Sequence, residues 1–147
     1  MNHIVVPQKI SAVRKYAKTH RDTIVAVYLY GSTAEGTATV LSDIDLAILL
    51  REPLKRDALV IERKAQIAFQ RLFEPEVDVR ALTEKTSLPF LEEVLRDHVL
   101  LAVNDDEYRA EFESRAFARI IDFRPILHEY LAAMQERLQK GTYASQY

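Results

Sequence analysis

Residues 23–50, TIVAVYLYGSTAEGTATVLSDIDLAILL, decide the fold that this sequence can adopt. The first eight, Thr23–Tyr30, are almost all apolar and rich in β-branched and aromatic types, which is typical of a buried strand. Gly31 and Ser32 end this strand, and ten residues separate them from the next apolar run. That run, Asp43–Leu50, is apolar on both parities after its first residues, which predicts a second strand covered on both faces.

Two carboxylates stand at the beginning of the second strand. Because side chains alternate between the faces of a strand, Asp43 and Asp45 point to one side, with roughly 7 Å between their Cα atoms. At about 4–5 Å and an effective dielectric of about 20, their repulsion would cost on the order of 3–4 kcal/mol. A divalent cation between them would offset this cost, and Mg²⁺ prefers oxygen ligands. The pair is a candidate metal site, with ordinary surface acids as the alternative.

A third carboxylate, Asp78, lies in a short predicted strand at residues 76–82, EVDVRAL. Val77, Val79 and Ala81 share one parity of this strand, and Asp78 has the other. If this strand pairs beside the second one, three carboxylates converge. Such a group could hold two metal ions for an in-line displacement at phosphorus.

The combination of Gly31-Ser32, a ten-residue gap, Asp43-x-Asp45 and the later Asp78 resembles the DNA polymerase β-like nucleotidyltransferase superfamily. The short length and the form SDIDLAILL are most similar to the minimal nucleotidyltransferases, the MntA-type antitoxins encoded beside HEPN toxins. The resemblance implies an α/β (α+β) fold in which a mixed β-sheet is flanked by helices, with further helices at the C-terminus.

These residues predict nucleotidyl transfer, in which a hydroxyl attacks the α-phosphorus of a nucleoside triphosphate and pyrophosphate leaves. Asp43 and Asp45 would hold two Mg²⁺ ions, and Asp78 would bind one of them and accept the hydroxyl proton. The resemblance adds that the nucleotide is ATP and that AMP is attached to a tyrosine of the cognate HEPN ribonuclease toxin, which silences the toxin. The expected partner is therefore that toxin, in a hetero-oligomer.

Three residues are expected to bind the nucleotide. Gly31 would let the backbone approach the phosphates, because glycine tolerates unusual backbone angles. Ser32 would hydrogen-bond the terminal phosphates together with backbone N–H groups of the turn. Ser42, directly before the carboxylate pair, completes this set.

Two other functions stay open at this point. One is a small-molecule nucleotidyltransferase of the aminoglycoside type, although such enzymes usually carry a substantial extra helical domain and only about forty residues follow Val103. The other is a non-enzymatic antitoxin that blocks its toxin by contact alone.

The composition sets further limits. A chain of 147 residues predicts one domain, with a core at about 23–103 and a helical C-terminal extension at about 104–140. The absence of cysteine excludes disulfides and thiolate zinc sites. No apolar run reaches the length of a membrane span and the N-terminus does not resemble a signal peptide, so we expect a cytoplasmic protein without a membrane partner. The net charge of −2 argues against nucleic acid as a partner.

The remaining elements follow from periodicity. We expect helices at Pro7–His20, Leu54–Phe73 and Ser87–His98, and an edge strand at Val99–Val103. From Asn104 onward, apolar residues recur at helical spacing, and Pro125 must either kink one helix or separate two.

Overall fold

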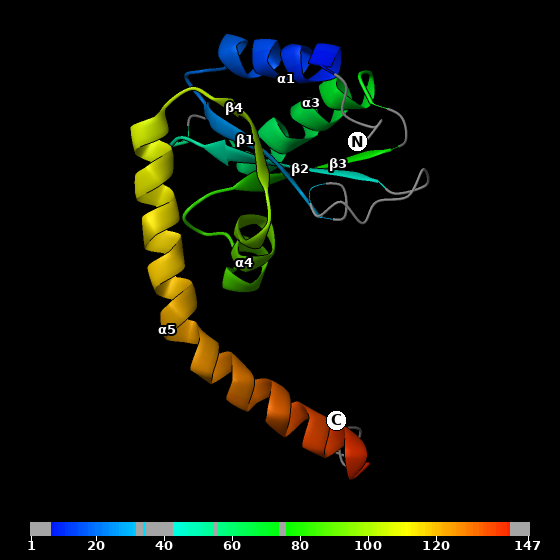
Figure 1. Ribbon diagram of the computed structural model, residues 1–147, viewed down its shortest axis with the longest axis vertical. Helices are drawn as coiled ribbons and strands as arrows, with labels where there is room; N and C mark the ends of the chain where they lie inside the picture. The colour runs from blue at the N-terminus through cyan, green and yellow to red at the C-terminus, as the bar shows by residue number, and fades with distance from the viewer. Residues whose placement is uncertain (1–6, 32–33, 35–42, 55, 74–75, 142–147) are drawn as a thin grey trace.

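The computed structural model describes residues 7–31, 34, 43–54, 56–73 and 76–141. One four-stranded sheet lies between helices on its two faces (Figure 1). The elements are α1 (Pro7–Thr19), β1 (Ile24–Tyr30), β2 (Ile44–Leu50), α3 (Ala58–Gln70), β3 (Val77–Leu82), α4 (Leu88–Arg96), β4 (Val99–Val103) and α5 (Asp106–Gln139). The predicted mixed sheet flanked by helices is therefore confirmed.

The strand order in the sheet is β3-β2-β1-β4. β1 is antiparallel to both of its neighbours, whereas β2 and β3 are parallel because α3 carries the chain back between them. The antiparallel register places Tyr30, the last residue of β1, opposite Asp45 near the start of β2. The end of the first strand and the carboxylates of the second therefore meet at one end of the sheet.

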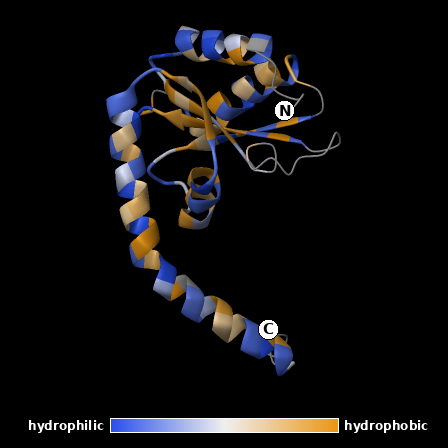
Figure 2. Cartoon of the chain, viewed as in Figure 1, coloured by the Kyte–Doolittle hydropathy of each residue, from blue (hydrophilic) through white to orange (hydrophobic). Residues whose placement is uncertain are grey.

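Alternate side chains of β2 point to opposite faces of the sheet and pack into two separate apolar clusters. Ile44 and Leu46 pack into a cluster that includes Val13 of α1 and Phe69 of α3. Ala47 and Leu49, on the opposite face, pack against α4 and against the first half of α5. Most residues of β1 and β2 are hydrophobic, and the middle of the sheet is mainly orange in Figure 2. The core thus extends beyond residues 23–103, since α1 and α5 both contribute buried side chains.

Side chains of α3 protect the exposed edge of β3. Gln66 donates its Nε2 hydrogen to the carbonyl of Val77 and accepts a hydrogen bond from the N–H of Val79 at 2.7 Å. The amide thereby replaces the backbone of a missing neighbouring strand around Asp78. Glu62 and Gln70 lie one turn before and one turn after Gln66 on the same face of α3. Glu62 accepts a hydrogen bond from Ala81 N–H, and Gln70 accepts one from Val77 N–H.

We expect Gln66→Leu to lower the free energy of unfolding by about 1–3 kcal/mol, because two partly buried backbone groups of β3 lose their partners. Urea denaturation followed by circular dichroism measures the change. Gln135→Leu makes the same substitution at an exposed position of α5 and should change the midpoint little. Equal midpoints for Gln66→Leu and the unchanged protein would contradict the edge-protecting role.

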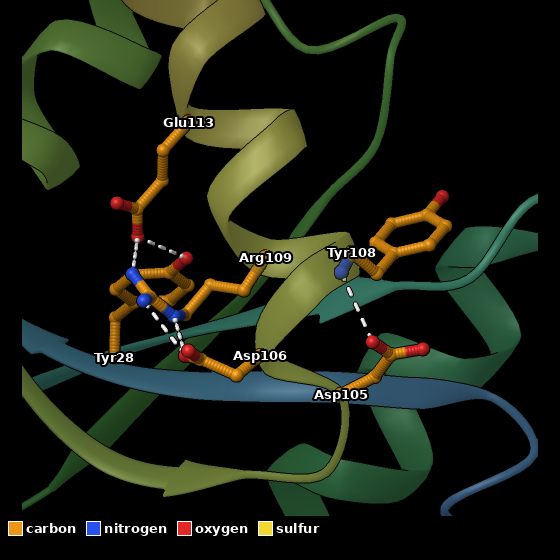
Figure 3. Close-up of polar contacts among 6 residues, drawn as sticks. All are labelled: Tyr28, Asp105, Asp106, Tyr108, Arg109 and Glu113. Carbon is orange, nitrogen blue, oxygen red and sulfur yellow. Dashed lines mark hydrogen bonds and ion pairs between the residues drawn. The ribbon is translucent and has the colours of Figure 1, made fainter.

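A polar network fixes the first turns of α5 to the sheet (Figure 3). Asp105 caps the helix by accepting a hydrogen bond from Tyr108 N–H at 3.0 Å. Tyr28 of β1 donates its hydroxyl to Glu113 at 2.8 Å, and Arg109 donates to the same oxygen at 2.9 Å. Burial is the main cause that raises the pKa of Tyr28 far above its ordinary value, so its hydroxyl remains a donor.

The second half of α5 extends away from the sheet (Figure 1). Of the two possibilities for Pro125, the structure has one helix with the proline inside it. After Ile120 the helix exposes large apolar side chains, among them Ile121 and Tyr130, which are 64% and 63% exposed. No helix in the described part of the chain, α5 included, is long and apolar enough to cross a membrane.

Candidate active site

The carboxylates of two neighbouring strands lie side by side at the end of the sheet. In the parallel register of β2 and β3, Asp45 is paired with Asp78. Both side chains lie on the face that α4 and α5 cover, because Asp45 shares its parity with Ala47 and Leu49. The pairing of β3 beside β2, on which the convergence of the carboxylates depends, is therefore present.

Asp43 directly precedes β2 and lines the same cavity as the other two carboxylates. This cavity has a volume of about 640 Å³ and extends over the β3 edge of the sheet toward α3. Arg63 and Arg80 also line it, so two guanidinium groups stand near the carboxylates. Such a mixture of acids and cations suits a ligand that carries phosphates together with metal ions.

The carboxylates influence one another. Burial raises the pKa of Asp45, and the nearby carboxylates of Asp78, Asp43 and Glu93 raise it further. Arg80 offsets part of the negative charge, since its Nε lies 3.3 Å from the Asp78 carboxylate. Negative charge is thus concentrated around Asp45.

We expect Asp45→Asn to raise the free energy of unfolding in metal-free buffer at pH 7. The pKa of Asp45 is higher in the folded protein than its ordinary 3.8, so ionisation of this group opposes folding above the raised pKa. Below 3.8 the group is protonated in both states, and the advantage of the variant should disappear. Urea denaturation at several pH values measures the difference, and a variant less stable than the unchanged protein at pH 7 would contradict it.

Gly31 has a backbone conformation and a close neighbour that both disfavour a side chain. Its φ is +74°, in the left-handed region, where a side chain is strained. A Cβ atom at this position would overlap Oδ2 of Asp45 and lie 3.3 Å from its Cγ. Glycine therefore leaves the space that the Asp45 carboxylate occupies. Ser32 and Ser42, the two other candidates for nucleotide binding, lie outside the described residues.

The donor set suits Mg²⁺, although the side chains are not yet gathered around one point. Among the residues that the structure describes, no three His, Asp or Glu side chains lie close enough together to hold a metal ion. Asp43, Asp45 and Asp78 nevertheless offer only oxygen ligands to one cavity, which are the ligands that hard cations prefer. The carboxylates of Asp78 and Asp43 add to the effect of burial in raising the pKa of Asp45, so a cation beside Asp45 would offset their repulsion.

A second cavity, which the sequence reasoning missed, adjoins the carboxylates on the side of α4. It has a volume of about 340 Å³ and brings Tyr30, Phe90 and Glu93 to Asp45 and Asp78. The rings of Tyr30 and Phe90 pack edge to face with centroids 5.7 Å apart. The three-residue spacing of Phe90 and Glu93 indicates that they share one face of a helix. The sequence does not indicate that this face lies next to Tyr30 at the end of β1.

Three solved structures share the fold of this chain. The first is a toxin–antitoxin with AMP-PNP, whose matching chain is 19% identical with a TM-score of 0.62, over 88% of this chain and 98% of its own length. A mutant of the toxin–antitoxin MntA-HpeT matches with 19% identity and a TM-score of 0.66, over 91% and 98%. The third is a tri-AMPylated Shewanella oneidensis HEPN toxin in complex with MNT antitoxin, at 15% identity and a TM-score of 0.63, over 89% and 97%.

The comparison with curated protein sequences gives no match. The family model of the polymerase β nucleotidyltransferases, in contrast, matches residues 11–107. This range runs from α1 to the beginning of α5 and includes every carboxylate that lines the two cavities. Because the match spans well over half of the sequence, the chain belongs to the polymerase β nucleotidyltransferase family.

Proposed function

We propose that this protein is an antitoxin that transfers AMP from ATP to a tyrosine of its cognate HEPN toxin, with two Mg²⁺ ions. The observation that carries the proposal is the pairing of Asp45 with Asp78 on neighbouring strands, with Gly31 packed against Asp45. The antitoxin role is supported by the solved relatives, which come from toxin–antitoxin complexes, one with AMP-PNP and one with an AMPylated toxin.

Asp43, Asp45 and Asp78 would hold the metal ions. When bound, Mg²⁺ neutralises phosphate charge and lowers the pKa of an attacking hydroxyl. Asp78 would also accept the proton of the toxin's tyrosine, while Arg80 keeps its carboxylate in place beforehand. Gly31 leaves room for the backbone to approach the phosphates beside Asp45.

The proposal is tested by incubating the purified protein with its proposed partner, the cognate HEPN toxin, together with ATP and Mg²⁺. Intact-mass spectrometry should show the HEPN protein heavier by one or more AMP groups, and EDTA should prevent the change. An unmodified HEPN protein together with modification of an aminoglycoside in a parallel reaction would contradict the proposed acceptor.

A non-enzymatic antitoxin makes a different prediction in the same assay. The double variant Asp43→Asn/Asp45→Asn keeps the shape of the site but removes two of the carboxylates. If this variant neutralised the toxin fully while the mass of the HEPN protein stayed constant, contact alone would be sufficient and AMP transfer would not be the antitoxin mechanism.

A further inference from the structure

Two cavities meet at the same pair of carboxylates from different sides. Asp45, Asp78 and Arg80 line both the cavity toward α3 and the cavity toward α4. In a displacement at phosphorus, the attacking and leaving oxygens lie roughly in line on opposite sides of the phosphorus atom. A site for nucleotidyl transfer therefore needs two compartments that share the catalytic groups, and this arrangement supplies them.

The two cavities differ in size and in the chemistry of their walls. The larger one, of about 640 Å³, has Arg63 in addition to Arg80, and guanidinium groups bind phosphates well. The smaller one, of about 340 Å³, has the rings of Tyr30 and Phe90 and the carboxylate of Glu93 beside the three shared residues. Tyr30 is almost fully buried, while Phe90 is partly exposed and closes the aromatic wall from α4. Because Tyr30 is almost fully buried, Phe90 supplies the accessible ring surface that a flat apolar group can contact.

We propose that the smaller cavity is the acceptor subsite and that it takes the phenol ring of a tyrosine side chain, an assignment that rests on the proposed function. The phenol oxygen forms a bond to the α-phosphorus of ATP, the bond from that phosphorus to the bridging oxygen breaks, and pyrophosphate leaves toward the larger cavity. The phenol proton passes to the Asp78 carboxylate. Phe90 contacts the acceptor ring and thereby determines which hydroxyl is modified.

The test separates binding of the acceptor from binding of the nucleotide. For Phe90→Ala we expect the KM for the cognate HEPN toxin to rise about tenfold, because an aromatic contact of roughly 1 kcal/mol and the buried ring area are lost. The Kd for AMP-PNP, measured by calorimetry, should be unchanged. Phe90→Tyr keeps the ring and should restore the KM. Ile67→Ala removes an exposed apolar side chain of α3 that lines neither cavity, and should change neither constant.

Thermal unfolding of Phe90→Ala checks that the variant folds, which the partial exposure of Phe90 favours. If Phe90→Ala weakened AMP-PNP and left the KM for the HEPN protein unchanged, the smaller cavity would bind the nucleotide and the assignment would be overturned. Unchanged values for both constants would overturn it as well. A different result would contradict the proposed function itself: the wild-type protein would transfer no AMP to the HEPN toxin.

Discussion

Asp45→Asn is expected to slow AMP transfer by about 10³-fold, because loss of a metal-binding carboxylate removes several kcal/mol of transition-state stabilisation. Asp45 is placed to have this effect, since it lies beside Asp78 and lines both cavities. The measurement is the rate at which label from α-³²P-ATP appears on the HEPN protein at saturating Mg²⁺.

A matched control distinguishes this loss from a general effect of removing a negative charge. Asp122→Asn makes the same change at an exposed position of α5, outside the cavities, and should keep the full rate. Misfolding would not account for the loss in Asp45→Asn, because this variant is expected to be more stable at pH 7. A rate within a few fold of the unchanged protein would show that Asp45 does not take part in the chemistry.

Gly31→Ala is expected to slow AMP transfer by about 10²-fold, because a displaced catalytic group loses a large part of its effect. The new Cβ would overlap Oδ2 of Asp45, so the carboxylate must rotate away from its position beside Asp78. The positive φ adds a backbone cost of about 1–2 kcal/mol, which should appear as lower stability. The same label-transfer assay and urea denaturation measure the two effects.

The chain offers a control that carries the backbone cost alone. Gly141 has a φ of +67° at the end of α5, and a Cβ there would meet nothing within 4 Å. Gly141→Ala should therefore transfer AMP at the full rate. If Gly31→Ala transferred AMP as fast as Gly141→Ala, the close approach of Gly31 to Asp45 would not contribute to catalysis.

The sheet could be predicted because its signals are local. The two-sided apolar pattern of residues 43–50 predicted a strand covered on both faces, and this is confirmed by the two clusters that β2 joins. A strand–helix–strand order such as that from Asp43 to Leu82 is typical of parallel pairing, and β2 and β3 are parallel. Once the strands are paired, alternation of side chains is sufficient to bring Asp45 beside Asp78.

Features that depend on tertiary contacts could not be predicted in this way. Gln66 resembles an ordinary surface residue of an amphipathic helix, and only its position over β3 shows that it replaces a strand. α3 begins at Ala58 rather than Leu54, because Asp57 accepts a hydrogen bond from Leu59 N–H and caps the helix there. α4 begins at Leu88 with Ser87 at the N-cap position, and the Ser87 side chain makes no capping hydrogen bond.

Binding of Mg²⁺ in the presence of AMP-PNP, measured by isothermal titration calorimetry, tests most directly whether the paired carboxylates form one metal site. We expect the wild-type protein to bind Mg²⁺, and Asp45→Asn and Asp78→Asn each to weaken binding by at least about tenfold. Equal Mg²⁺ affinity in the unchanged protein and in both variants would contradict it.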